Sequence, residues 1–398
     1  MAGNDTGLRR VFDALAPARS RIEARDEEIL AEQVTIAQIP APTGDERRRA
    51  RWIAARLTAM RLDDVSVDDA GNVIGVRQGA TSEAPVVVCA HLDTVFGADV
   101  PLDVRRNANR LTGPGIGDNA RGLAAMLAVA AEFGGQRLRP ARPIIFAATT
   151  GEEGAGDLRG VRHLFQTAAR NAHAAIAVDG AGDERIVACA LGCRRYRVEY
   201  RGTGGHSWAA FGMPNAVHAA AGLVARLTAI PLAGRPRTTL TVSRIGGGSA
   251  INAIPADGWI EVDMRSTSSV ELTRLDSGLR AAAQEALYEE NARRRRGTPP
   301  LSVELRLLSE RPAGEVPESD ALVRYAAAAT GCVGRSAELA VASTDANIPI
   351  SLGIPAIAIG GGGRGGDTHT PHEWYENHEG TRGVVRALVL LAAVAGIS

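Results

Sequence analysis

Several carboxylates and histidines of this chain directly follow short apolar segments, where they could bind a divalent cation. His91 and Asp93 follow one such segment, Glu152 and Glu153 a second, and Asp179 a third. In an extended chain, side chains two residues apart face the same side, so one of His91 and Asp93 can bind an ion while the other orients a ligand. Two adjacent glutamates allow one carboxylate to bind a cation while the other transfers protons.

Two loops add further candidate ligands. Asp118 lies in a glycine-rich loop just before a helical pattern, and His369 follows a second glycine-rich run; His372, three residues later, stays ambiguous. The complete set has only nitrogen and oxygen donors: His91, Asp118, Glu153, Asp179 and His369. Such a set suits a hydrolytic site for zinc or a similar divalent ion. One bridging carboxylate with two terminal ligands for each ion would make a two-metal centre.

The composition excludes several other chemistries. All 45 basic residues among the 398 are arginine, which rules out a lysine Schiff base, a P-loop lysine and a Ser-Lys dyad. The 45 acidic residues cancel this charge and aromatic residues make up only 4%, so we expect no nucleic-acid partner. The sequence shows no signal peptide, no apolar run of 18 residues and no paired cysteine motif. We therefore expect a reduced, cytoplasmic protein without a membrane partner.

The glycine-rich loop before Asp118 could instead cradle a phosphate group. However, its third glycine is misplaced for a dinucleotide-binding fingerprint, and we expect no strand directly before it. Asp118 would also place a negative charge in the phosphate site. A nucleotide-binding α/β protein is therefore disfavoured.

The apolar segments predict a layered α/β fold. Buried strands and the main helices are expected at residues 85–90, 120–133, 143–148, 174–178, 355–359 and 379–394. This alternation predicts a sheet that helices cover on both faces. Because ligands collect at the carboxyl ends of such strands, the candidate metal ligands should meet there.

The pattern changes near Arg194. From there to about residue 308 the expected order is strand, helix, strand, strand, helix and strand, which is typical of a two-layer ferredoxin-like domain. The α/β pattern then resumes. We therefore predict one domain from residues 1–193 and 309–398, interrupted by an inserted α+β domain of residues 194–308.

Five motifs occur together and in order: His91-Leu-Asp-Thr94, Gly117-Asp-Asn119, Gly151-Glu-Glu-Gly154, Val178-Asp-Gly180 and His369-Thr-Pro-His-Glu373. In this combination the chain resembles, over residues 30–395, the di-zinc metallopeptidase family of glutamate carboxypeptidase, aminoacylase, succinyl-diaminopimelate desuccinylase and peptidase T. The resemblance implies a zinc-peptidase α/β/α sandwich with an inserted ferredoxin-like lid or dimerisation domain. It also implies two divalent ions, which are expected to be zinc, with cobalt or manganese as alternatives.

The resemblance assigns the metal ligands individually. His91 and Asp179 would bind one ion, and Glu153 and His369 would bind the other. Asp118 would bridge the two ions, and in this family the peptide bond after the bridging aspartate is often cis.

The resemblance also assigns the residues that act on the substrate. Asp93 would orient His91, and Glu152 would take a proton from the attacking water and return it to the leaving nitrogen. In the inserted domain, His206 would stabilise the oxyanion, often in the active site of the partner subunit. Asn252 and Arg265 match positions that hold the carboxylate or carbonyl of the substrate.

The function that the resemblance implies is hydrolysis of an amide bond in a short peptide by a metal-activated water. Asp179 as a terminal ligand resembles the aminopeptidase and dipeptidase branches, and peptidase T is closest. Gly117-Asp-Asn119 departs from the usual Asp-Asp pair of peptidase T. The alternative is a deacylase of N-acyl or otherwise capped amino acids. A more distant alternative is an inactive peptide-binding homologue. The resemblance further implies a homodimer formed through the inserted domain.

Overall fold

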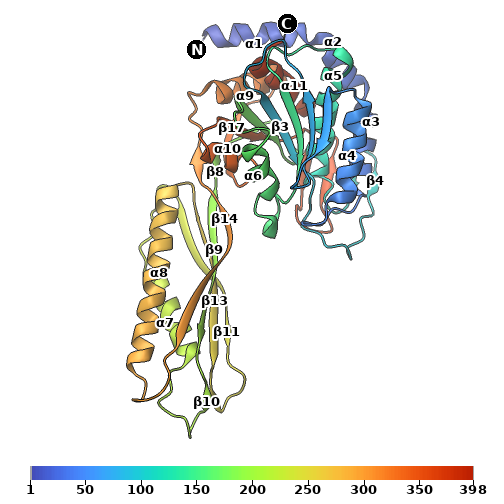
Figure 1. Cartoon of the computed structure of the whole chain (residues 1–398). Helices are drawn as coiled ribbons and strands as arrows, with labels where there is room; N and C mark the ends of the chain where they lie inside the picture. The colour runs from blue at the N-terminus through green and yellow to red at the C-terminus, as the bar shows by residue number, and fades with distance from the viewer. Residues whose placement is uncertain (1, 398) are drawn as a thin grey trace. The chain divides into compact units, whose positions relative to one another are not determined.

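The computed structural model describes residues 2–397, which form two compact units (Figure 1). Unit 1 consists of the chain up to Ala190 and from Glu315 onward, and unit 2 consists of Leu191–Gly314. Each unit has its own buried hydrophobic core. Within residues 2–397, no helix is both long and apolar enough to cross a membrane.

Unit 1 is built on a mixed sheet, which in the described part of the chain has nine strands. The strand order is β1-β2-β6-β3-β7-β17-β8-β15, with β16 beside β8. The bounds are β1 Asp64–Val67, β2 Val73–Arg77, β3 Val86–His91, β6 Ile144–Thr149, β7 Ala174–Val178, β8 Arg185–Ala190, β15 Gly314–Glu315, β16 Glu338–Ala342 and β17 Ala356–Ile359. Strands β6, β3, β7 and β17 run parallel to one another, so their carboxyl ends meet at one edge of the sheet.

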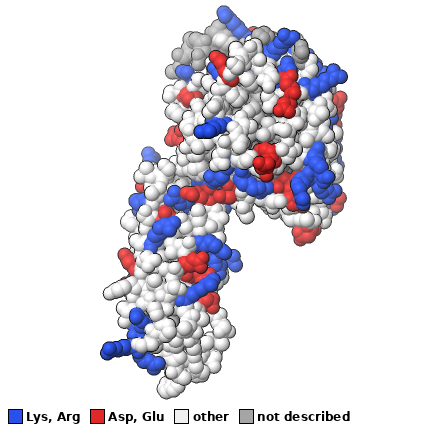
Figure 2. Space-filling view, viewed as in Figure 1, with Lys and Arg blue, Asp and Glu red and all other residues white. Residues whose placement is uncertain are grey.

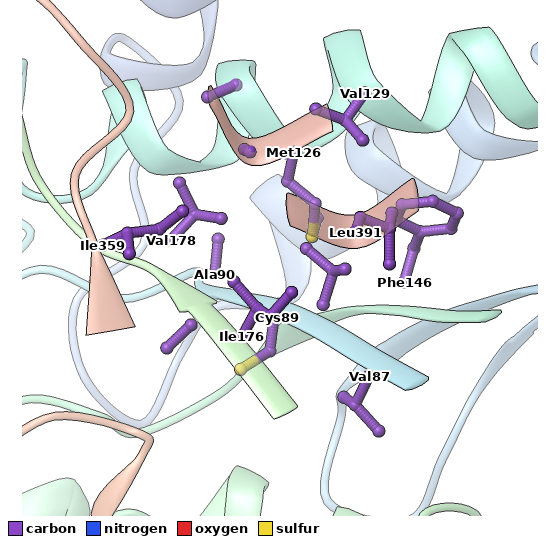
Figure 3. Close-up of a cluster of buried hydrophobic side chains, with 14 of the residues drawn as sticks. Val87, Cys89, Ala90, Met126, Val129, Phe146, Ile176, Val178, Ile359 and Leu391 are labelled. Carbon is purple, nitrogen blue, oxygen red and sulfur yellow. The ribbon is translucent and has the colours of Figure 1, made fainter. Parts of the chain in front are cut away.

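Helices cover this sheet because its central strands are apolar along their whole length. Every residue of β3, β6 and β7 is buried, which requires cover on both faces. The helices are α1 Ala2–Ala14, α2 Ala16–Ala24, α3 Asp26–Ala37, α4 Arg47–Ala59, α5 Ala120–Phe133, α6 Arg159–Gln166, α9 Ala321–Cys332, α10 Asn347–Ser351 and α11 Thr381–Ala395, with short 3-10 turns at Gly134–Gln136 and Gly154–Gly156. Figure 3 shows Met126 and Val129 of α5 packing in the core with Leu391 of α11 and Phe146 of β6. The predicted α/β fold is confirmed.

A second, small antiparallel sheet in unit 1 brings two distant loops together. Its order is β18-β19-β5-β4, with β4 Arg105–Asn107, β5 Arg110–Thr112, β18 Arg364–Gly366 and β19 Trp374–Glu376. The pairing of β19 with β5 places the loop after residue 112 beside the segment 367–373. The expectation that no strand precedes the glycine-rich loop was wrong, because β5 ends at Thr112. This strand has three residues and one buried side chain, so it leaves no apolar run in the sequence.

Unit 2 has the predicted ferredoxin-like order of elements. The elements are β9 Gly192–Arg201, α7 Ala216–Thr228, β11 Thr238–Gly247, β13 Asp257–Ser266, α8 Ser269–Ala292 and β14 Ser302–Arg311, with a small hairpin of β10 Gly205–His206 and β12 Ala253–Ile254. The antiparallel sheet has the order β11-β13-β9-β14. Helices α7 and α8 pack together against this sheet. Alternating burial along β13 follows from a sheet covered on one face.

Candidate metal centre

Neighbouring parallel strands deliver several candidate ligands to the same place. His91 is the last residue of β3, which lies between β6 and β7 in the sheet. Glu152 and Glu153 follow β6, and Asp179 follows β7. Across the sheet edge, His91 Nε2 lies 3.8 Å from Asp179 Oδ1.

Asp118 lies between the two histidines of the predicted set. Its Oδ1 is 2.9 Å from His91 Nε2, and its Oδ2 is 3.1 Å from His369 Nε2. His369 Nε2 is also 2.9 Å from Glu153 Oε1. The cluster therefore has two halves, His91 with Asp179 and His369 with Glu153, and Asp118 belongs to both.

The neighbour of Asp118 holds the start of α5 against the end of β7. Asn119 Oδ1 accepts hydrogen bonds from the backbone N–H groups of Gly122 and Gly180, at 3.0 and 3.1 Å, and its Nδ2 donates to the carbonyl of Val178 at 3.0 Å. A Cβ atom at Gly122 would lie 2.3 Å from the Val178 carbonyl oxygen, so this close approach requires glycine. The peptide bond between Asp118 and Asn119 is cis.

The carboxylate of Asp93 contacts the backbone of the glutamate pair more closely than it contacts the imidazole. Asp93 Oδ1 accepts a hydrogen bond from Glu152 N–H and Oδ2 accepts one from Glu153 N–H, both at 2.9 Å. Thr43 Oγ1 also donates to Oδ2 at 2.9 Å. His91 Nδ1 is 3.0 Å from the Asp93 backbone carbonyl but 3.7 Å from its carboxylate. Asp93 thus positions both the histidine and the two glutamates.

Glu373 contributes a contact that the sequence analysis missed. Its side chain is buried and accepts hydrogen bonds from the backbone N–H groups of Gly115, Gly117 and Asp118, at 2.9, 2.8 and 2.7 Å. Burial raises the pKa of Glu373 to about 7, although these backbone donors oppose the shift. Glu373 therefore fixes the loop that carries Asp118. Its only signal in the sequence is its place at the end of the fifth motif.

Asp345 is a second buried carboxyl that the sequence analysis missed. It accepts a hydrogen bond from Thr149 Oγ1, at the end of β6, just before the glutamate pair. Its Oδ1 is buried and has no hydrogen-bond partner within residues 2–397. Burial raises the pKa of Asp345 to about 6. In the sequence, Asp345 lies in the short segment 343–346, and nothing there distinguishes it from an ordinary exposed loop residue.

The electric field of the cluster favours a cation. Burial lowers the pKa of His91, but the carboxylates around it outweigh that effect and raise its pKa well above the usual range. Hydrogen bonds to Asp118 and Glu153 raise the pKa of His369 to about 10. Conversely, burial raises the pKa of Asp118, but the two histidines outweigh it and hold that pKa well below its usual range. The carboxylates thus favour positive charge at this place, and divalent ions held by the same atoms would supply it.

The residues present fit such ions. Ligand atoms of His91, Asp118 and Glu153 all lie within 4.8 Å of one another. Asp118 Oδ1 is buried and makes no hydrogen bond of acceptable geometry to any described residue, although His91 Nε2 is near. A buried carboxylate oxygen with no directed donor is suited to a metal ion. A set of imidazole and carboxylate donors suits a divalent metal ion.

Glu152 and His372, two further residues of these loops, differ in burial. Glu152 is buried, 5% exposed, and its backbone is held beside the cluster by Asp93. His372 is exposed, and its backbone N–H donates to Thr370 Oγ1 at 3.2 Å. The ring of His372 forms no ion pair in the part of the chain that the structure describes.

In unit 2 the structure brings two of the three predicted residues together. His206 ends β10 and pairs with Ala253 of β12, directly after Asn252. The Asn252 carbonyl accepts a hydrogen bond from Ser207 N–H at 2.9 Å. Both His206 and Asn252 are exposed, and His206 Nδ1 accepts a hydrogen bond from Trp208 N–H at 3.2 Å.

Arg265 lies elsewhere in unit 2. It pairs with Cys193 at the end of the sheet where the chain enters and leaves the unit. It lies eight positions along β13 from Asp257 at the other end, which corresponds to about 26 Å. The Arg265 guanidinium forms an ion pair with Asp263, because its Nε lies 2.8 Å from Asp263 Oδ2.

Comparisons with known proteins show where this chain belongs. The profile of peptidase family M20/M25/M40 matches residues 87–394. A LysW-lysine hydrolase of Deinococcus radiodurans is 33% identical over 128 residues, which are 32% of this chain and 33% of that protein. A probable carboxypeptidase of Aspergillus clavatus is 27% identical over 284 residues, which are 65% of this chain and 62% of that protein. The chain thus spans about a third and about three fifths of these two curated relatives.

A solved structure shows the same fold. The aminopeptidase PepT of Bacillus cereus superposes with a TM-score of 0.76 at 21% identity, over 93% of this chain and 99% of that one. The family profile covers most of the chain, and all five candidate metal ligands lie inside the matched region. The chain therefore belongs to peptidase family M20/M25/M40.

Proposed function

We propose that this protein is a metal-dependent hydrolase that cleaves an amide bond in short peptides, as an aminopeptidase or a di- or tripeptidase would. The observation that carries this proposal is the position of Asp118 between two histidines, each of which has a further carboxylate beside it. Membership of the peptidase family and the fold shared with an aminopeptidase support it.

Five residues would hold two divalent ions. Zinc is the metal that we expect, and cobalt and manganese are alternatives. His91 and Asp179 would bind one ion, Glu153 and His369 the other, and Asp118 both. Ions bound there would make water more acidic and polarise a substrate carbonyl. Because Asp118 uses a different oxygen for each half of the cluster, it can serve both without moving.

Glu152 would transfer the proton. Its carboxylate would take a proton from the attacking water and later give it to the leaving nitrogen. Asp93 and Glu373 would act as positioning residues, since Asp93 fixes the backbone of the glutamate pair and Glu373 fixes the loop of Asp118. Such rigid support keeps the reacting groups in place during the reaction.

The names of the similar proteins indicate two substrate classes. One relative is named a LysW-lysine hydrolase, which is not the name of a peptidase, and this favours the alternative of a deacylase of N-acyl or capped amino acids. The probable carboxypeptidase and the aminopeptidase favour a peptide. An inactive peptide-binding homologue is a third reading, and the presence of all the motif residues counts against it.

We further propose that unit 1 is the catalytic domain and that unit 2 is a lid or dimerisation domain. In the view of Figure 2, the tip of unit 2 near β10 shows uncharged residues, with basic residues beside them near the end of α8. Trp208, Phe211 and Ile251 near this end are 87%, 79% and 105% exposed, which is unusual for side chains of this size. Contact with a second copy would cover them and bring His206 and Asn252 to the partner's active site. A single-chain mass in sedimentation at micromolar concentration would contradict the dimer.

Assays of released amino groups over matched dipeptides, tripeptides and N-acyl amino acids test the proposed substrate class. We expect turnover of the peptides with a free amino terminus and little turnover of the acylated compounds. Turnover of the acylated compounds alone would replace the proposal by its alternative. Absence of turnover with any amide, in protein loaded with zinc, cobalt or manganese, would favour the inactive homologue.

Substitution of Glu152 separates proton transfer from metal binding. Because Glu152 is assigned no metal, Glu152→Ala should keep the metal content of the wild type and lose about 10²–10⁴-fold in kcat. Atomic absorption and steady-state kinetics on the same preparation measure the two effects. Glu83→Gln, which removes an exposed carboxylate, is the matched control and should change neither. A Glu152→Ala protein without bound metal would contradict this division of roles.

A further inference from the structure

A cavity of about 730 Å³ lies within unit 1 and borders the candidate metal centre. Asp118 and Asp179 form part of its wall, and the same cavity extends to Arg364, Trp374 and His378. Small-molecule sites usually have volumes of roughly 300–1,000 Å³, so a short peptide would fit. The residues at the far part of this wall have no role in the proposed chemistry.

Three arginines line the cavity, and their partners differ. Arg335 is engaged, because it lies 3.0 Å from Asp183 and 3.0 Å from Glu379. Arg185 and Arg364 form no ion pair or side-chain hydrogen bond with any residue in the described range 2–397. Arg185 nevertheless has acidic neighbours, since it follows Glu184 and stands beside Glu338 on the next strand.

Arg364 lies on the segment that leads to the metal ligand His369. It is the first residue of β18 and is exposed. In the small sheet it stands opposite Glu376, but that carboxylate accepts a hydrogen bond from Asn109 Nδ2 at 3.3 Å and also stands opposite Arg110. The Arg364 guanidinium is therefore the cation of this wall that is least committed to the protein itself.

The residues next to Arg364 leave its side chain uncovered. Gly365 and Gly366 follow it, and a Cβ atom at Gly366 would lie 2.8 Å from the ring of Trp374. Since side chains alternate along a strand, Arg364 and Gly366 share one face of β18 with Trp374 of β19. Arg364 and the Trp374 indole are therefore diagonal neighbours on one face of the small sheet, and the Arg110 guanidinium lies 4.0 Å from the centre of that ring.

We propose that Arg364 binds the terminal carboxylate of the substrate, so that the enzyme selects short peptides with a free carboxyl end. This inference rests on the proposed function, and it gives Arg364 the carboxylate that the resemblance assigns to Arg265 or Asn252. A guanidinium offers two parallel N–H donors to a carboxylate, and Arg265 already uses its Nε on Asp263.

A matched pair of substrates tests this assignment. The same tripeptide is prepared with a free terminal carboxylate and with a terminal amide, and kcat/KM is measured for both. We expect the wild type to prefer the acid by about 10-fold or more, since hydrogen bonds to a charged group contribute about that much. Arg364→Gln should lower kcat/KM for the acid by about 10- to 100-fold and leave the amide nearly unchanged, and Arg364→Lys should restore part of the preference.

Arg185→Gln is the control, because it removes the other unpaired arginine of the same cavity. It should keep the wild-type preference for the acid. Equal turnover of acid and amide by the wild type, equal losses on both substrates in Arg364→Gln, or a loss of the preference in Arg185→Gln would each overturn the assignment.

A binding measurement separates this inference from the proposed function. Calorimetry with the zinc-loaded Glu152→Ala chain compares the affinities of the acid and the amide without turnover. If the wild type cleaves neither peptide but Glu152→Ala binds the acid more tightly, the proposed function fails and the role of Arg364 stands. Equal affinities for the two peptides would overturn the role of Arg364, whatever the wild type cleaves.

Discussion

The structure depends on one electrostatic constraint, which is the concentration of carboxylates around Asp118. Several acidic side chains end at the same edge of the sheet, and most of them are buried. Bringing like charges out of water and close together is unfavourable unless cations or N–H donors compensate them. Two histidines at the centre and backbone N–H groups around it provide that compensation in the structure. The same constraint makes the cluster a strong candidate for divalent ions.

The fold meets this constraint through parallel strands and the loops that follow them. Strands β6, β3 and β7 bring three motifs to one edge, although long segments of sequence separate them. Buried arginines then anchor the loops by donating to backbone carbonyls. Arg49 donates to Leu92 at 2.6 Å, and Arg121 donates to Gly361 and Gly380 at 2.8 and 2.7 Å. These contacts hold the chain on both sides of the candidate metal centre, which explains why large charged side chains are fully buried there.

The sequence was sufficient for the parts that depend on local pattern. The apolar runs predicted the central strands, and the motifs predicted which side chains meet, because the ends of parallel strands converge. Glu373 and Asp345 were missed because their function lies in contacts with distant atoms: Glu373 accepts from Gly115, which is 258 residues away. No periodicity marks such a contact. The short strand β5 was missed for a related reason, since its pairing with β19 and not its own residues makes it a strand. Arg364 could not be singled out in a chain whose every basic residue is arginine.

We infer that the cluster around Asp118 binds two divalent ions. The most direct test is a zinc titration of the metal-free, folded wild-type chain by calorimetry, with the bound zinc counted afterwards by atomic absorption. We expect two zinc ions per chain, and fewer for Asp118→Asn, because that substitution replaces the one carboxylate that both halves of the cluster share. A folded wild-type chain that binds no zinc, or an Asp118→Asn chain that binds two ions as tightly as the wild type, would contradict it.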